Sequence, residues 1–150
     1  MQSLAKPGTM ATIAAMDSLE ERILLVEDEF SLAGDWNDRY RLLVEWGDAD
    51  TPLPQDQCTP QWEVSGCSSP LWLKVKWQGD VIEVRGASPG LLPRALAALL
   101  ARLFDGLDDV SGATPALLER LDLRSHLSPT RGLALERMLE RIRSAPKDAP

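Results

Sequence analysis

The feature that most constrains the fold is a stretch in the middle of the chain in which apolar residues recur with the two-residue period of a β-strand. Between positions 71 and 77 an apolar side chain recurs at every second position, and the side chains between them include two lysines. The alternating apolar residues are Leu71, Leu73, Val75 and Trp77. Such alternation is typical of a strand with one apolar face. Gln78–Asp80 can turn the chain, Val81–Arg85 returns as a second strand, and Trp62–Ser65 is expected to join them. The pattern therefore predicts a small antiparallel sheet of about three strands.

Stretches of helical spacing precede and follow this hairpin. The last of them opens with Ser128-Pro129, a capping residue followed by a proline in the first turn. Pro93 leaves open whether the helix around it starts near Leu92 or has an irregular first turn. The predicted helices run from Leu19 to near Gly34, from a cap at Asp35 to a stop at Gly47, over Ala95–Phe104, from Thr114-Pro115, and from Ser128-Pro129. Helices on either side of a small sheet predict a single α+β domain, with the helices packed on one face of the sheet.

Composition and charge narrow the class of protein. A chain of 150 residues fits one domain, which we place at residues 17–145 between flexible tails at 1–16 and 146–150. The net charge of −7 argues against nucleic acid and against an anionic membrane surface as partners. The longest apolar run is far shorter than a membrane span. Two cysteines are too few for a disulfide-rich secreted scaffold, so we expect a reducing cytoplasmic location.

Cys67 is the main candidate for chemistry. It stands just before the predicted strand, preceded by Gly66 and followed by Ser68 and Ser69. Glycine relaxes the backbone limits there, and the serines favour a turn, so a thiol on this segment can be presented to a partner. A free cysteine is also commonly a small buried core residue. The local sequence leaves both interpretations open.

Other candidates are weaker. Cys58 could resolve a disulfide with Cys67, but the spacing is not that of a redox motif. With His126 the two cysteines supply three zinc ligands, and they lack metal spacing. His126 is read either as a structural residue or as a polar neighbour of the thiol. Arg131 falls in the first turn of the last helix, where the helix dipole disfavours a cation; it either faces solvent or favours a nearby thiolate.

Four segments in a fixed order carry a resemblance. They are Trp36–Leu43, with Trp, an acid, a base and Tyr; Val64–Trp72, with Gly-Cys-x-Ser-x-aliphatic-Trp; the apolar stretch Ala95–Leu103; and Leu123–Gly132 followed by Met138–Arg143. Together they resemble the SufE family (SufE and its close relative CsdE), the sulfur-acceptor proteins of cysteine desulfurases. The likeness spans roughly residues 19–145.

The resemblance implies a function. In this family a pyridoxal-phosphate-dependent desulfurase of the SufS or CsdA kind holds sulfur as a persulfide. The acceptor takes that sulfur and passes it to an iron–sulfur scaffold. By resemblance, Cys67 is the persulfide-accepting catalytic thiol. Gly66 eases a swing of its loop, and His126 and Arg131 occupy signature positions at the start of the last helix. The protein would be an accessory that activates the desulfurase, with no cofactor of its own.

Some positions depart from the family pattern. Trp62 stands where Asn is usual, Ser68 where Gln is usual, and Ala87 and Pro89 where acidic residues are usual. These departures concern partner affinity and loop geometry more than thiol chemistry. Three alternatives stay open: a docking regulator of a desulfurase without sulfur transfer, a Cys58–Cys67 redox switch, and metal storage or scaffolding.

Overall fold

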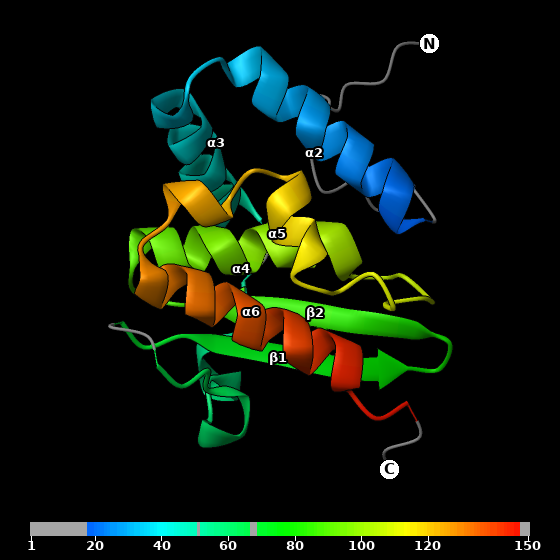
Figure 1. Ribbon diagram of the computed structural model, residues 1–150. Coiled ribbons are helices and arrows are strands. Elements are labelled where there is room, and N and C mark those ends of the chain that lie inside the picture. Colours follow the sequence, from blue (N-terminus) through cyan, green and yellow to red (C-terminus); the bar gives the residue numbers. More distant parts are fainter. Residues whose placement is uncertain (1–17, 51, 67–68, 148–150) are drawn as a thin grey trace, which may run out of the picture.

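The computed structural model describes residues 18–50, 52–66 and 69–147 and has the predicted α+β architecture (Figure 1). The elements are α2 (Leu19–Ala33), α3 (Trp36–Ala49), η1 (Gln55–Gln57), η2 (Pro60–Trp62), β1 (Trp72–Gln78), β2 (Val81–Ala87), α4 (Leu91–Phe104), α5 (Ala116–Arg120), η3 (Arg124–His126) and α6 (Pro129–Ser144). The predicted N-terminal tail 1–16 and residues 148–150 lie outside the described residues.

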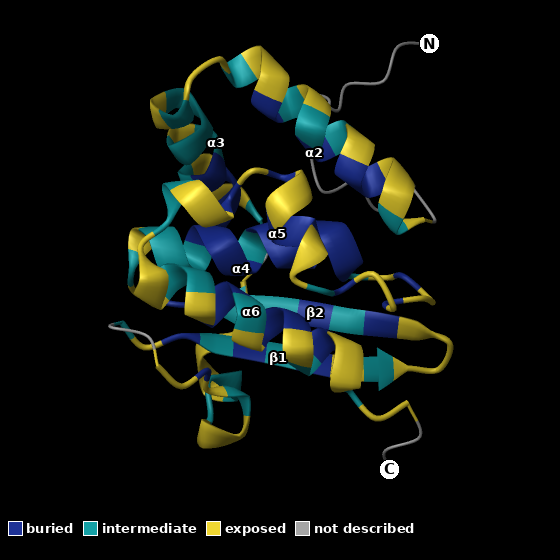
Figure 2. Cartoon of the chain, in the orientation of Figure 1, coloured by how far each residue is buried: buried dark blue, intermediate teal, exposed yellow. Residues whose placement is uncertain are grey.

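The predicted hairpin is confirmed. Strands β1 and β2 pair antiparallel, with Trp72 opposite Ala87 and Gln78 opposite Val81. The alternating side chains of one face are buried; they are Leu73 and Val75 on β1 and Ile82 and Val84 on β2. Helix α4 packs against β2 and α3, and α6 packs against β1 and α4, so the two helices cover this face (Figures 1 and 2).

The predicted third strand at Trp62–Ser65 is wrong in extent. The described sheet has two strands, and the segment retains a bridge between Glu63 and Trp72. Its first residue belongs instead to η2, which begins at Pro60. Proline fixes φ and lacks an N–H, so it favours the start of a helical turn over a ladder. The predicted strand is thus reduced to a short contact with the start of β1.

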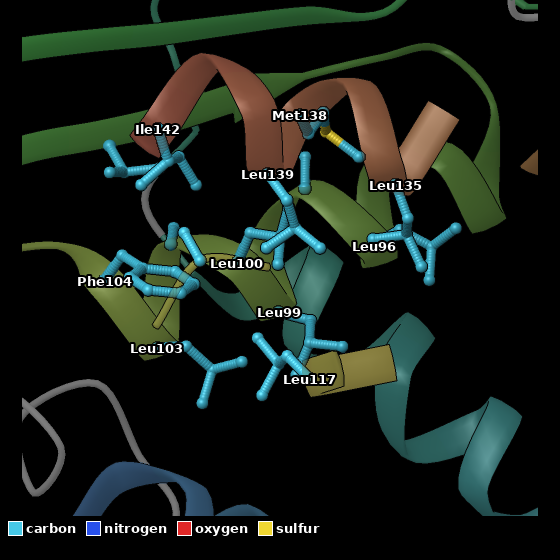
Figure 3. Packing of buried hydrophobic residues seen from close by; sticks show 14 of the residues in the cluster. Leu96, Leu99, Leu100, Leu103, Phe104, Leu117, Leu135, Met138, Leu139 and Ile142 are labelled. Carbon is cyan, nitrogen blue, oxygen red and sulfur yellow. The ribbon is translucent and has the colours of Figure 1, made fainter. Parts of the chain in front are cut away.

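The core lies between α4 and its neighbours. Most of α4 from Ala95 to Phe104 is buried, as expected for a helix that is apolar nearly all round. Figure 3 shows Leu96, Leu100 and Phe104 of α4 beside the labelled side chains of α6, and Leu99 beside Leu117 of α5. The facing side chains of α6 are Leu135, Met138, Leu139 and Ile142, each no more than 1% exposed. Pro93 is the third residue of α4, in the first turn, where its missing N–H costs no helical hydrogen bond.

The prediction that Gly47 ends its helix is wrong. Helix α3 continues to Ala49, and Gly47 lies where α3 crosses α4. A Cβ on Gly47 would lie 3.1 Å from both Cα and N of Ala95. The absence of a side chain therefore allows the two helices to pack backbone to backbone.

Candidate functional site

The two ends of the segment that contains Cys67 are paired with each other. The N–H of Val64 donates to the carbonyl oxygen of Leu71 at 2.7 Å, next to the Glu63–Trp72 bridge. These contacts form a stem below residues 65–70. Cys67, the predicted persulfide acceptor, lies with Ser68 outside the described residues, so its position stays a prediction. The described residues on either side of it are called here the entering chain (residues 62–66) and the leaving chain (residues 69–71).

Two arginines of α6 hydrogen bond the entering chain. Nη1 of Arg137 donates to the carbonyl oxygen of Ser65 at 2.6 Å and to its Oγ at 3.2 Å. One helical turn later, Arg141 donates to the carbonyl oxygens of Trp62, Glu63 and Leu73 at 2.7, 2.9 and 2.9 Å. Burial lowers the pKa of Arg141, without removing its charge at neutral pH. The segment before Cys67 is therefore bound to α6 through backbone carbonyls.

The leaving chain is held by the turn before α4. Ser88 Oγ donates to the carbonyl oxygen of Pro70 at 2.5 Å and accepts from the N–H of Gly90 at 3.1 Å. Ser69 lies against the same turn, since a Cβ on Gly90 would approach its Oγ to 2.9 Å. Ser65, before Cys67, is thus held by α6, whereas Ser69 and Pro70, after it, lie against the turn that leads into α4.

Arg131 lies beside the leaving chain, at the start of α6. Ser128 caps this helix by accepting from the N–H of Arg131 at 3.3 Å, which confirms the predicted cap and places Arg131 in the first turn. The arginine borders a narrow apolar hollow whose other lining residues are Leu71, Pro93, Leu96, Thr130, Ala134 and Met138. Within the described part of the chain, its buried Nε has no hydrogen-bond partner. A buried N–H donor without a partner is uncommon in folded proteins.

His126 has contacts on another element. Its ring stacks on Trp36 of α3, with centroids 4.2 Å apart and the planes 18° from parallel. Its Nε2 lies 3.4 Å from Oδ2 of Asp122. These contacts describe a structural role in joining η3 to α3. Its predicted role as a polar neighbour of the Cys67 thiol stays a prediction, because Cys67 lies outside the described residues.

Cys58 lies in an open groove of about 730 Å³ between the end of α3 and the turn before α4. Its Sγ is 3.6 Å from the carbonyl oxygen of Pro54. Burial, and then the negative charge of Asp56, raise the pKa of the Cys58 thiol. At neutral pH this sulfur is therefore protonated and a poor nucleophile.

Metal-binding clusters and membrane spans are both missing from the described part of the chain. Over ranges 18–50, 52–66 and 69–147, no three His, Cys, Asp or Glu side chains are grouped so that they could hold a metal ion. In the same ranges no helix has both the length and the apolarity to cross a membrane.

Sequence reasoning missed Arg137, Arg141 and Ser88. Arginines four positions apart on α6 signal a shared helical face. Nothing in that spacing shows that the face lies against a chain segment about seventy positions earlier. The Ser88 hydroxyl is similarly ordinary in sequence, and its partner, the carbonyl oxygen of Pro70, is a backbone atom.

Comparison with known sequences adds three findings. Residues 25–145 match the family model described as "SufE: Fe-S metabolism associated domain". An uncharacterized SufE-like protein of Rhizobium etli is 32% identical over 139 residues, covering 88% of this chain and 91% of that protein. A SufE-like protein of Rhizobium meliloti, also uncharacterized, is 29% identical over 136 residues, or 86% of this chain and 94% of that protein.

A solved structure shares the fold. The solution structure of a hypothetical protein from Thermus thermophilus matches with a TM-score of 0.65 and 21% identity. The match covers 86% of this chain and 94% of that one. It supports one continuous fold over most of the chain.

Proposed function

The chain belongs to the SufE family, and from this membership we propose that Cys67 accepts persulfide sulfur from a pyridoxal-phosphate-dependent cysteine desulfurase. In this proposal the protein stimulates the desulfurase and relays the sulfur towards iron–sulfur cluster assembly. The observation that carries it is the match of residues 25–145 to a family associated with Fe-S metabolism, because the matched range includes the whole 64–71 stem and loop. A cytoplasmic location is part of the proposal.

The chemistry is an exchange with no net oxidation. The Cys67 thiolate attacks the terminal sulfur of the desulfurase persulfide, and a new sulfur–sulfur bond forms on Cys67. The old sulfur–sulfur bond breaks, and the cysteine of the desulfurase leaves as a thiolate. Such exchange needs an attacking thiolate that the partner can reach.

The described surroundings of Cys67 suit that requirement. Ser65, Gly66 and Pro70 are exposed, so the chain on both sides of the cysteine lies at the surface. Arg131 brings a positive charge beside Leu71, where the loop returns to the sheet. A nearby cation favours the thiolate form of a cysteine. We propose that Arg131 supports the thiolate form of Cys67.

The redox-switch alternative gains little support. A disulfide switch needs one thiolate to attack, and the raised pKa of Cys58 makes it a weak attacker or partner. Cys58 is therefore a suitable control residue. The loss of its thiol should leave sulfur acceptance intact.

The test is a sulfur-transfer assay read by intact mass. The protein is incubated with a cysteine desulfurase and L-cysteine, and the gain of one sulfur is measured for the parent, Cys67→Ser and Cys58→Ser. We expect the gain in the parent and in Cys58→Ser, and none in Cys67→Ser. A Cys67→Ser protein that still gains sulfur would overturn the assignment.

The same variants separate the docking alternative. A regulator that acts by binding alone would still stimulate the desulfurase when Cys67 is replaced by alanine. Sulfur transfer predicts that the stimulation is lost with the thiol. Desulfurase turnover with Cys67→Ala, measured at saturating concentration of the variant, gives the answer.

A further inference from the structure

The two outer edges of the hairpin are closed to different extents. Along β2 the outward backbone groups are occupied. The N–H of Ile82 donates to the carbonyl oxygen of Leu107 at 2.9 Å. The N–H of Val84 donates to Oδ1 of Asp105 at 2.8 Å. Unpaired N–H and C=O groups on a sheet edge are a template for a further strand, and β2 has been closed against one.

Within the described part of the chain, the edge of β1 is occupied only at its start. There Arg141 donates to the carbonyl oxygen of Leu73 at 2.9 Å. Backbone groups on one edge recur at every second residue, so those of Val75 and Trp77 point the same way as those of Leu73. Among the described residues these groups of Val75 and Trp77 have no hydrogen-bond partner. The second half of β1 therefore presents an unpaired edge.

An open groove of about 610 Å³ lies beside this edge. It is lined by the η1–η2 segment, by residues 74–76 of β1 and by the end of α6. Figure 1 shows β1 on the side of the hairpin away from α4, which packs against β2. The strand from Val75 to its end at Gln78 is about 10 Å long at about 3.3 Å per residue. The open edge thus has room for about four residues of extended peptide.

The groove carries positive charge in a chain whose net charge is −7. Its charged lining residues are Lys74, Lys76 and Arg141 against one carboxylate, that of Asp56. Lys76 is exposed. Lys74 lies 3.3 Å from Glu83, but that carboxylate also pairs with an arginine of β2. The cations of the groove therefore favour an acidic occupant.

A second copy of this chain is a poor occupant of the edge. Two β1 edges paired about a twofold axis would place the lysines of both copies on the same face, beside one another. Like charges on neighbouring strands destabilise the pairing. The charge of the groove therefore fits a partner of opposite charge better than it fits itself.

We propose that the free edge of β1 binds an extended acidic segment of a partner protein as an added antiparallel strand. Side chains of a strand alternate between faces, so carboxylates at every second position of the segment would lie beside Lys74 and Lys76. The side chains between them would face Val75 and Ala145, where apolar groups fit. Backbone pairing supplies affinity and the lysines select the sequence. The site consists of described residues alone and is independent of Cys67.

The test uses a capped, dye-labelled peptide of sequence Glu-Val-Glu-Val-Glu-Val, with binding to the full chain read by fluorescence anisotropy. Two matched peptides carry N-methyl groups, one on the valines and one on the glutamates. In the proposed antiparallel strand the valine N–H groups face β1 and the glutamate N–H groups face away. We expect the N-methyl-valine peptide to lose binding and the N-methyl-glutamate peptide to keep it. A Lys-Val peptide of the same length should not bind.

The lysine contribution is measured with two charge reversals. Lys76→Glu should weaken binding of the Glu-Val peptide by about three- to ten-fold, as for replacing an exposed ion pair by a repulsion. Arg41→Glu makes the same change of charge on α3, outside the groove, and should alter the Kd by less than about twofold at about 0.15 M salt. Circular dichroism confirms that both variants are folded.

Hydrogen exchange read by NMR locates the peptide on the edge. With the peptide at about ten times its Kd, exchange of the Val75 and Trp77 amides should slow by about tenfold. The Val84 amide, already bonded to Asp105, should not change. These two amides and the N-methyl pair report strand addition, which charge attraction alone would leave unchanged.

Three results would overturn the proposal. The first is equal binding of the two N-methylated peptides, which would mean that backbone pairing is absent. The second is no binding of the Glu-Val peptide up to millimolar concentration, which would leave the lysines as a shield against aggregation of the edge. The third is a dimer in sedimentation equilibrium that the peptide does not dissociate, which would assign the edge to a second copy.

Discussion

Helix α4 and the segment 62–66 are held in place by different forces. In α4 the stabilising contacts are apolar: Leu96, Leu99 and Phe104 are at most 1% exposed and pack against α6 and α5 (Figure 3). In segment 62–66 only Val64 is buried, and the contacts are hydrogen bonds from two arginines to backbone oxygens. Apolar burial is nondirectional, whereas a guanidinium with several acceptors fixes orientation.

This difference suits two tasks. A tightly packed helix keeps the scaffold unchanged, because the loss of even one methylene from such a core lowers the stability of the fold. A segment held by a few hydrogen bonds that are exposed or only partly buried can change its conformation at small cost, since water competes for the same groups. The segment 62–66 can therefore change its conformation while the core remains folded.

The largest expected effect comes from the core. Leu99→Ala removes a side chain that is 0% exposed, and we expect the free energy of unfolding to fall by about 3 kcal/mol. The remaining folded protein should accept sulfur at the parent rate. Urea unfolding followed by circular dichroism gives the first quantity, and the mass assay gives the second.

Leu24→Ala is the matched control, because Leu24 is 53% exposed on α2. It should change the free energy of unfolding by less than about 0.5 kcal/mol. Equal losses for Leu24→Ala and Leu99→Ala would contradict the assignment of the core to α4.

A smaller effect is expected from the hydrogen-bonded segment. Arg141→Met removes the donors to three carbonyl oxygens while keeping the aliphatic stem, and we expect a cost of about 1.4 kcal/mol. The loss should be local, so amide exchange at Val64 should become about tenfold faster while exchange in α4 changes little. Hydrogen exchange read by NMR measures both regions in one sample.

Arg41→Met controls for loss of charge, since Arg41 is exposed and pairs with Asp38 on α3. It should leave the exchange rate of Val64 unchanged. If Arg141→Met accelerates exchange equally in α4 and at Val64, the two regions unfold as one unit and the comparison fails.

The smallest effect concerns Glu83 on the outer face of β2, and it depends on pH. Burial opposes ionisation of this carboxyl, but hydrogen bonds from Lys74, Arg85 and Gln78 outweigh it and hold its pKa below the ordinary value of 4.5. A lowered pKa in the folded state stabilises the fold above about pH 4.5, and this contribution is lost as the pH falls through the folded-state pKa. Glu83→Gln should therefore be less stable than the parent by ~0.5 kcal/mol at pH 7.

The difference should vanish at low pH, where both proteins carry a neutral side chain at position 83. Thermal melts of the two proteins between about pH 7 and about pH 3 measure it. A stability difference that grows as the pH falls would contradict the direction of the shift.

The sequence predictions were accurate where apolar burial holds the structure and less accurate elsewhere. The hairpin and the helices were predictable because burial leaves a period in the sequence, of two residues in β1 and about 3.6 in α6. The position of Gly47 was misread, since a glycine that ends a helix and one that lets two helices touch are alike in sequence. The third strand failed because Pro60 begins a helical turn just before it.

The site was predictable in part. The candidate thiol and the cap of α6 could be named from local patterns, and the cap at Ser128 is confirmed. The contacts of Arg137 and Arg141 could not be predicted, because their partners are backbone oxygens that carry no residue identity. The resemblance to the family came from the order of several motifs, and the chemistry of Cys67 itself stays a prediction.

The pairing of Val64 with Leu71 has a consequence for how a partner must approach. Six residues connect Val64 to Leu71, and Cys67 is three positions after Val64. An extended chain covers about 3.3–3.6 Å per residue, so the Cα of residue 67 can lie at most about 10 Å from that of Val64 while the stem stays intact. In the proposed function, sulfur is therefore handed over close to the stem and not at a distant site. The reactive groups of the donor and of the recipient would each have to come within this radius, so the two partners would bind overlapping surfaces one after the other.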